Sequence, residues 1–234
     1  MKKKDHKPLT PKYGSGKLQN VLDGQRPHWD SKLLDIPDMF GRGPSETARI
    51  ASEIFHRDGA RSILELGGGQ GRDTVFFAEN GFSVHVIDYS ESGIRLIRER
   101  AENIGLSGLV MASVHDVRLP LPFPDRSFDG CFAHMLYCMA LTTAELEFLA
   151  GEVRRILKPG GFHVYTVRNT KDPHYGKGAQ HGEDIYEMNG FIVHYFSRKK
   201  IDDLAKGYVV VNVEECEESR LPKKLFRVTL RKSV

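Results

Sequence analysis

Four glycines and one acid stand together between residues 63 and 72, in the run Ile-Leu-Glu-Leu-Gly-Gly-Gly-Gln-Gly-Arg. Glycine has no β-carbon, so its backbone can turn tightly and come close to a ligand. A helix that begins after such a turn presents free N–H groups in its first turn. Glu65 adds a carboxylate near the end of the apolar run. These residue types in this order are typical of a nucleotide-binding loop between a strand and a helix.

The spacing of the glycines excludes two common nucleotide loops. A dinucleotide fingerprint that starts at Gly67 requires glycine at position 72, where Arg72 stands. A P-loop requires Gly-Lys followed by Ser or Thr, which this segment lacks. The pattern that fits is Glu-x-Gly-x-Gly-x-Gly, formed by Glu65, Gly67, Gly69 and Gly71. A tight turn without any ligand is the alternative interpretation, because many loops contain glycine.

The elements that must position this loop follow from the hydrophobic pattern. Strands are expected at residues 62–66, 82–88, 109–114, 128–133, 162–167, 208–213 and 225–230. Helices are expected after Ser45, from about residue 71 to 80, after Ser90, after Thr142 and after Ser197. An acidic turn is expected at residues 214–218, between the last two strands. The order predicts an α/β fold: a Rossmann-like, doubly wound, mostly parallel sheet of seven strands, with a C-terminal antiparallel strand and three α/β/α layers.

Two further carboxylates follow neighbouring strands. Asp88 ends the second strand, and Asp116 follows the third. A carboxylate at the first of these positions accepts hydrogen bonds from ribose hydroxyls in open α/β folds. Both acids and the glycine loop are therefore expected at the carboxyl ends of adjacent strands, where such sheets bind ligands. The alternatives are that Asp88 only caps the next helix and that Asp116 only favours a turn.

With these motifs in order, the chain from about Ser45 to Arg231 resembles the class I S-adenosylmethionine-dependent methyltransferases. The glycine loop is similar to their motif I, and the turn Lys158-Pro-Gly-Gly161 and the terminal strand pair are similar too. The resemblance implies S-adenosylmethionine as cofactor and S-adenosylhomocysteine as product. It implies that Asp88 binds the ribose diol beside Tyr89, that Asp116 and the backbone of Val117 bind adenine, and that the rest of the cofactor site comes from Glu65, Gly67, Gly68, Gly69 and Gln70.

Composition divides the chain into two parts. Residues 1–28 hold seven Lys/Arg and two Asp, which leaves about −2 for the remainder of a chain whose net charge is +3. We expect residues 1–28 to be a flexible basic segment and residues 29–234 to form the methyltransferase domain. By the resemblance, residues 29–60 supply a lid and a helix, with Trp29, Phe40 and Arg42 as lid candidates. The charge of the folded part argues against nucleic acid as a partner.

The compartment is predicted from the cysteines and the apolar runs. Cys131, Cys138 and Cys216 form no CxxC pair, which favours free thiols in a reducing compartment. The start of the chain lacks the apolar stretch of a secretory signal, and no run is long enough to span a membrane. A cytoplasmic location without membrane contact is therefore expected. Oligomeric state is not indicated.

Acceptor residues are expected after the fourth strand, after the fifth strand and in the lid. The segment His134-Met-Leu-Tyr-Cys-Met-Ala140 lacks the Asn/Asp-Pro-Pro-Tyr/Phe motif of enzymes that methylate amino groups of bases. Its methionines and cysteine make a soft, apolar surface, and His134 and Tyr137 are its polar groups. Either polar side chain can equally be a hydrogen-bonded part of the wall.

Residues 169–196 form a long polar insert that is expected to cover the acceptor side. His174 and His194 join His134 and Tyr137 as catalytic candidates, since a neutral histidine near the acceptor can act as a general base. The three histidines of the insert, with Glu183 and Asp184, fit no standard metal-ligand spacing, so no metal is expected. The insert is loosely similar to the tellurite-resistance and thiol methyltransferase branch.

The sequence therefore predicts a methyltransferase that transfers a methyl group to a small-molecule acceptor, such as a thiol or another soft nucleophile. Orientation of the reactants supplies about 7–11 kcal/mol in favourable cases, so a catalytic triad is not required. Two alternatives stay open: an acceptor that is a protein or RNA bound by the basic segment, and a cofactor-binding regulatory module without turnover.

Overall fold

The computed structural model describes residues 16–218 and 223–234. Its main sheet has seven strands in the spatial order β3-β2-β1-β4-β5-β10-β9. The first five pair in parallel, whereas β10 runs antiparallel to both of its neighbours. The bounds are β1 Ser62–Leu66, β2 Ser83–Asp88, β3 Val110–Val114, β4 Phe128–His134, β5 Leu157–Arg168, β9 Tyr208–Glu218 and β10 Lys223–Lys232. The predicted fold class is thus confirmed.

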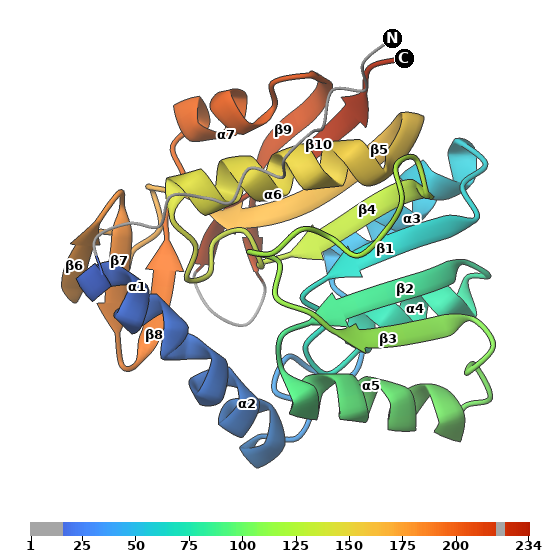
Figure 1. Cartoon of the computed structure of the whole chain (residues 1–234), viewed down its shortest axis with the longest axis horizontal. Coiled ribbons are helices and arrows are strands. Elements are labelled where there is room, and N and C mark those ends of the chain that lie inside the picture. The colour runs from blue at the N-terminus through green and yellow to red at the C-terminus, as the bar shows by residue number, and fades with distance from the viewer. Residues whose placement is uncertain (1–15, 219–222) are drawn as a thin grey trace, which may run out of the picture.

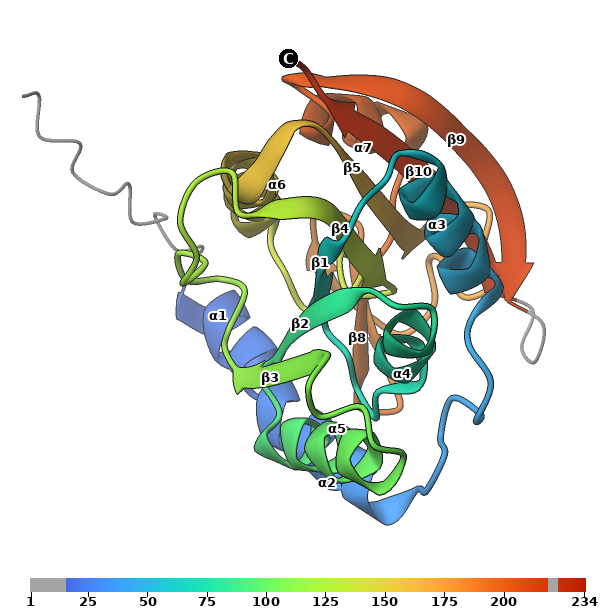
Figure 2. The same cartoon turned by 90° about the vertical axis from the view of Figure 1, so that its right-hand side faces the viewer.

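Helices cover both faces of this sheet (Figure 2). One face carries α3 (Glu46–Arg57), α4 (Arg72–Glu79) and α5 (Glu91–Asn103), and the other carries α6 (Thr143–Ile156) and α7 (Arg198–Leu204). The N-caps predicted at Ser45, Thr142 and Ser197 are confirmed, because each side chain accepts a hydrogen bond from the first turn of its helix. Ser90, near which a helix was expected to begin, caps α5 in the same way. Each face therefore encloses a core of its own. Within the described residues, no helix combines the length and the apolar character that crossing a membrane requires.

Residues 16–28 were predicted to be flexible, but the structure shows them as ordered helices. They lie in α1 (Gly16–Asp23) and in the first part of α2 (Gln25–Asp35). Leu22 is 2% exposed and packs in a cluster with Ile185 and Ile192. These partners lie more than 160 positions later in the chain, so nothing near Leu22 in the sequence indicated that it would be buried. Residues 1–15, also predicted to be flexible, lie outside the described residues.

The insert is more ordered than the predicted polar cover. It forms a second sheet of β6 (Ala179–Gly182), β7 (Ile185–Met188) and β8 (Phe191–His194). Its two hairpin turns hold residues with positive φ, namely Glu183 and Asp184 in one and Asn189 and Gly190 in the other. Such pairs suit the left-handed turns that join antiparallel strands.

The helices α1 and α2 pack against this second sheet, and we call α1, α2 and strands β6 to β8 together the cap. Gln25 joins its two parts, because its Nε2 donates to Gly190 O at 3.0 Å and its Oε1 accepts from Ile192 N at 3.3 Å. Its amide thus pairs with the free edge of β8. Figure 1 shows that strands β1 to β4 point toward the side on which the cap lies.

The prediction of an acidic turn at 214–218 is wrong, because this stretch belongs to strand β9. It pairs with a basic part of β10: Glu217 lies opposite Lys224, and Glu214 lies opposite Arg227. Arg227 Nε is 2.8 Å from Glu214 Oε1. Opposite charges on facing positions stabilise a strand pair, so the acids extend the strand. The connection at 219–222 lies outside the described residues.

We predict that Leu22→Ala loosens the cap selectively. Removing a buried leucine side chain leaves a cavity that costs about 2–5 kcal/mol. Hydrogen exchange of residues 16–35 should therefore become faster, while that of β1 and β4 stays unchanged. Leu34→Ala is the matched control, because Leu34 is 45% exposed on α2. Equal effects of the two substitutions would contradict the packing described here.

Candidate functional site

The glycine loop joins β1 to α4 at the edge of the sheet that faces the cap. Gly67 has φ +72°, in the left-handed region that favours glycine. A β-carbon on Gly68 would lie 2.4 Å from Val86 Cγ2, and one on Gly67 would lie 2.9 Å from Leu136 Cδ1. The loop thus requires glycine for its backbone shape and for its close packing against β2 and the segment after β4.

Asp88 holds this loop in place from the end of β2. It is 8% exposed. Its Oδ2 accepts a hydrogen bond from Gly69 N at 3.0 Å, and its Oδ1 accepts from Ser90 N at 2.9 Å. Burial raises the pKa of Asp88 despite these bonds. A carboxylate has about four acceptor positions, so capacity remains for a ligand hydroxyl beside the backbone N–H groups of Gly69, Ser90 and Tyr89.

Glu65 lies beneath the loop as a second buried acid. Burial, with the nearby charge of Asp73, raises the pKa of Glu65 to about 8. The Thr74 hydroxyl donates to its Oε2. Asp73 accepts from both the backbone N–H and the hydroxyl of Ser45, at 2.7 and 2.9 Å. Glu65 is therefore largely protonated at pH 7, and a cation bound nearby would favour its ionisation.

Asp116, the adenine candidate, is bound by a neighbouring arginine. Arg118 Nε lies 3.0 Å from its Oδ1 and Nη2 lies 2.7 Å from its Oδ2, while Arg118 N donates to Oδ1 at 3.0 Å. Burial opposes ionisation of Asp116, but these bonds outweigh it and lower its pKa. The other end of the guanidinium reaches the cap, since Nη1 lies 2.5 Å from Asp23 Oδ1.

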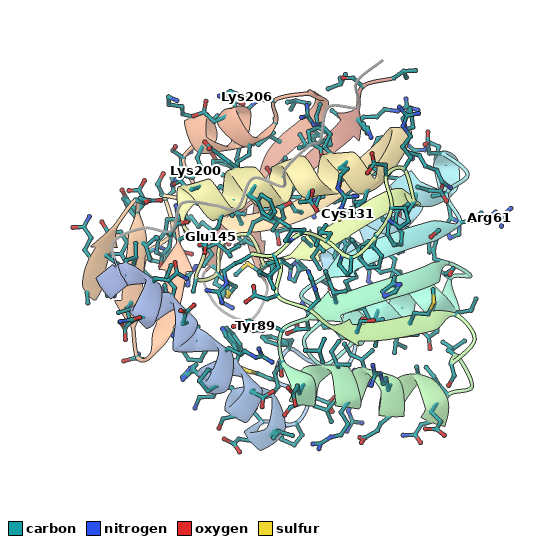
Figure 3. All side chains as sticks on the ribbon, in the orientation of Figure 1. Arg61, Tyr89, Cys131, Glu145, Lys200 and Lys206 are labelled. Carbon is teal, nitrogen blue, oxygen red and sulfur yellow. The ribbon has the colours of Figure 1, made fainter. Side chains whose placement is uncertain are left out.

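Tyr89 and Val117 flank these acids in sequence. Figure 3 shows Tyr89 on the side of the sheet that faces α2, whereas Arg61 lies at the opposite end. Burial raises the pKa of Tyr89, so the phenol stays protonated. Val117 is buried in the core with Leu66 and Ile87. Both positions border the carboxyl ends of β2 and β3.

Gln70 has a different role from the one expected of a cofactor ligand. Its Nε2 donates to Leu33 O at 2.8 Å and to Ile36 O at 2.9 Å, and its Oε1 accepts from Met39 N at 2.9 Å. These partners lie in the last turn of α2 and in the segment that follows it. The side chain of Gln70 therefore anchors the lid to the glycine loop and is not directed toward a ligand.

Two of the three lid candidates lie over the loop. A β-carbon on Gly69 would lie 3.4 Å from a ring carbon of Phe40. The Trp29 ring centroid is 6.3 Å from that of Phe40 and 5.2 Å from that of Phe191 in the insert. Arg42 instead points to solvent and pairs with Asp38 at 2.7 Å. The aromatic rings thus connect both parts of the cap to the glycine loop.

The four catalytic candidates do not converge. His134 ends β4, and its Nδ1 lies 3.0 Å from the hydroxyl of Thr166, which also accepts from Met135 N. His174 lies apart in the insert, where its Nδ1 accepts from Arg168 Nη2 at 2.8 Å. Of the four residues, His134 is the one that ends a strand beside the glycine loop.

Tyr137 and His194 are buried away from the loop. Tyr137 is 1% exposed, is stacked on Tyr165 and has a hydroxyl without a hydrogen-bond partner among the described residues. His194 is fully buried; its Nδ1 donates to Leu141 O at 2.7 Å and its Nε2 contacts Lys200 Nζ. Burial and the charge of Lys200 lower the pKa of His194 to about 4. These environments fit structural roles.

The direction of the chain after β4 explains where Tyr137 lies. Met135 adopts φ +64°, which is uncommon for a residue with a side chain. The turn leaves Leu136 against Gly67 and carries Tyr137 and Cys138 into the core. Sequence spacing could not reveal this left-handed residue.

Sequence reasoning also missed Asp30, although it noted the neighbouring tryptophan. Asp30 Oδ1 accepts from the Ser90 hydroxyl at 2.6 Å and from Ser92 N at 3.0 Å. The hydrogen bond from the Ser90 hydroxyl is the main cause that lowers the pKa of Asp30, and the bond from Ser92 N adds to it. The start of α5 is therefore bonded to both the site and the cap. Within residues 16–218 and 223–234, no three His, Cys, Asp or Glu side chains are grouped to hold a metal ion.

Comparison with known proteins gives a family match and many structural relatives. A family described as a methyltransferase domain matches residues 63–161. The chain is 27% identical over 163 residues to a 24-methylenesterol C-methyltransferase 2 from Oryza sativa subsp. japonica, covering 68% of this chain and 44% of the relative. It is 29% identical over 113 residues to a demethylmenaquinone methyltransferase from Tropheryma whipplei, covering 48% and 44%. The matches thus span less than half of each relative.

Among solved structures, one neighbour is the Burkholderia thailandensis 1,6-didemethyltoxoflavin-N1-methyltransferase, solved with 1,6-didemethyltoxoflavin and S-adenosylhomocysteine. Its TM-score is 0.73 at 19% sequence identity, and the match covers 96% of this chain and 94% of the neighbour. The N-methyltransferase NodS from Bradyrhizobium japonicum, solved with S-adenosylhomocysteine, has a TM-score of 0.66 at 15% identity and covers 90% and 99%. At such identities these likenesses establish the fold. The looser similarity to the tellurite-resistance and thiol branch stays a prediction.

We predict that Glu65→Gln changes the pH dependence of stability. The pKa of Glu65 is raised on folding, so the unfolded chain loses this proton first as the pH rises above 4.5 and the native state becomes progressively less favoured toward pH 8. Glutamine has no proton to lose and can still accept the bond from Thr74. The variant should match the wild type in urea unfolding at pH 5 and exceed it at pH 8.5. A constant difference across this range would contradict a raised pKa.

Proposed function

We propose that this chain, which belongs to the class I S-adenosylmethionine-dependent methyltransferases, transfers a methyl group from S-adenosylmethionine to a small-molecule acceptor. The observation that carries the proposal is the buried carboxylate of Asp88 at the end of β2, bonded to the glycine loop with acceptor capacity left for a ligand hydroxyl. The relatives are named as methyltransferases of small molecules, and two structural neighbours hold S-adenosylhomocysteine.

The residues present fit the cofactor by their chemistry. Asp88 can accept from a diol, the glycine loop allows close approach of a ligand, and the buried Glu65 can offset a cation such as an ammonium group. Asp116 is an acceptor for an exocyclic amino group, beside the buried Val117. These roles are proposals for Glu65, Gly67, Gly68, Gly69, Asp88, Tyr89, Asp116 and Val117.

The proposed reaction requires few catalytic groups from the protein. S-adenosylmethionine supplies a methyl group that is already electrophilic because it is bound to a sulfonium. The chain holds the acceptor in line and excludes water, which the cap residues Trp29 and Phe191 are suited to do. His134, oriented by the Thr166 hydroxyl, is the group we propose to accept a proton from the acceptor.

The acceptor is proposed to be a soft nucleophile such as a thiol, bound near Met135 and Met139. Both side chains are partly buried at the carboxyl end of β4, and thioether groups make a polarisable surface. The names of the relatives describe transfer to carbon and to a ring nitrogen. A screen for S-adenosylhomocysteine release should therefore include thiols, N–H heterocycles and carbon acceptors.

Calorimetry with S-adenosylmethionine tests the cofactor assignment. Hydrogen bonds to charged groups contribute about 1.5–3 kcal/mol, so Asp88→Asn should weaken binding by about tenfold or more. Asp35→Asn is the matched control, because Asp35 ends α2 and its carboxylate accepts a hydrogen bond from the Ser31 hydroxyl of the same helix. Absence of binding by the wild type, or equal binding by Asp88→Asn, would refute the proposal.

Once a turnover assay exists, two substitutions decide whether His134 or Tyr137 is the residue that accepts the proton. Tyr137→Phe removes a buried hydroxyl that has no partner among the described residues, so kcat should stay within about twofold. His134→Gln should lower kcat by about 10²-fold, the lower end for general acid–base catalysis. A loss in Tyr137→Phe with an intact His134→Gln variant would reverse the assignment.

A further inference from the structure

Arg118 is shared between the proposed adenine site and the cap. On one side it binds Asp116 through two guanidinium nitrogens and its own backbone N–H. On the other side its Nη1 donates to Asp23, the last residue of α1. The side chain of Arg118 is 17% exposed and that of Asp116 19%, so both groups are partly shielded from solvent.

The position of Asp23 is itself informative. A negative charge at the C-terminus of a helix is unfavourable, because that end carries a partial negative charge. The last turn of α1 holds no basic residue to offset it. The bond from Arg118 offsets this cost, with a smaller contribution from Gln19 Nε2 at 3.1 Å.

Arg118 already uses most of the acceptor capacity of Asp116. Its Nε lies 3.0 and 3.1 Å from the two oxygens, Nη2 bonds Oδ2, and the backbone N–H bonds Oδ1. The single Nε–H is shared between the two oxygens, so three N–H donors occupy most of the roughly four acceptor positions of the carboxylate. An amino group that binds Asp116 therefore competes with this shared Nε–H for the carboxylate oxygens. The guanidinium is then held less firmly by Asp116, and Asp23 gains weight as its second carboxylate partner.

Resting on the proposed function, we propose that Arg118 is a positioning residue that couples the adenine end of the cofactor to closure of the cap through Asp23. Cofactor binding shifts the guanidinium toward Asp23 and strengthens its bond to α1. Because Leu22 of α1 packs on Ile185 and Ile192, the insert is held with α1. By reciprocity, a closed cap binds the cofactor more tightly by the same factor.

The test measures hydrogen exchange of residues 16–35 with S-adenosylhomocysteine, adenosine or methionine as ligand. The first two ligands carry adenine and should slow exchange in the wild-type chain, whereas methionine alone should not. In Asp23→Asn the slowing should shrink, and the Kd for S-adenosylhomocysteine should rise by about two- to fivefold, the range of a partly exposed ion pair.

Asp35→Asn is the control, because it also removes an acid from the end of a cap helix, α2, but Asp35 bonds Ser31 and not Arg118. It should change neither quantity. Asp23→Glu, which keeps the carboxylate, should restore part of the effect. On an Arg118→Gln background, Asp23→Asn should add nothing, since their shared bond is already absent.

The outcomes distinguish this proposal from the one it rests on. If the wild-type chain binds neither S-adenosylhomocysteine nor adenosine, the proposed function fails. If both bind but Asp23→Asn behaves as Asp35→Asn does, or adenosine speeds exchange of the cap, the cofactor assignment stands and the coupling through Arg118 is overturned.

Discussion

The carboxylate of Asp88 is the interaction on which the rest of the site depends. It bonds the glycine loop through Gly69 and the start of α5 through Ser90, and it is nearly excluded from solvent. The glycine loop, the end of β2 and the start of α5 are thereby fixed at one edge of the sheet. A buried carboxylate is costly unless hydrogen bonds offset the loss of water, so its two backbone donors make this position tolerable. The acceptor positions that remain on its oxygens are the ones that a ligand hydroxyl can use.

A second layer of polar contacts joins this edge to the cap. Asp30 bonds the N-terminus of α5, the side chain of Gln70 bonds the segment after α2, and Gln25 bonds the edge of β8. Each contact uses a side-chain group to pair backbone atoms at the end of a helix or beside the edge of a strand, where regular structure leaves them without a partner. The cap is therefore attached to the loop that it covers, and its aromatic rings from α2 and β8 meet above that loop.

The sequence predicted what depends on local pattern. The parallel strands, the caps at Ser45 and Thr142 and the place of Asp88 at a strand end follow from periodicity and short motifs, and the structure confirms them. Contacts between distant segments were not predictable in this way. Leu22 finds its partners in the insert, Arg118 finds Asp23, and the left-handed Met135 turns Tyr137 into the core. The hairpin at Asn189-Gly190 is of the local kind, because an Asn-Gly pair favours a tight turn between antiparallel strands.

The sequence separation within the cap has a consequence for synthesis of the chain. At ribosomal rates of about 5–20 residues per second, Ile185 follows Leu22 by roughly 8–33 s. For that interval α1 and α2 have no insert sheet to pack on, although the strands from β1 to β5 are all made before the interval ends. A segment that is made before every strand of the main sheet is thus among the last to reach its final packing, and its leucines stay available to chaperones until the insert emerges.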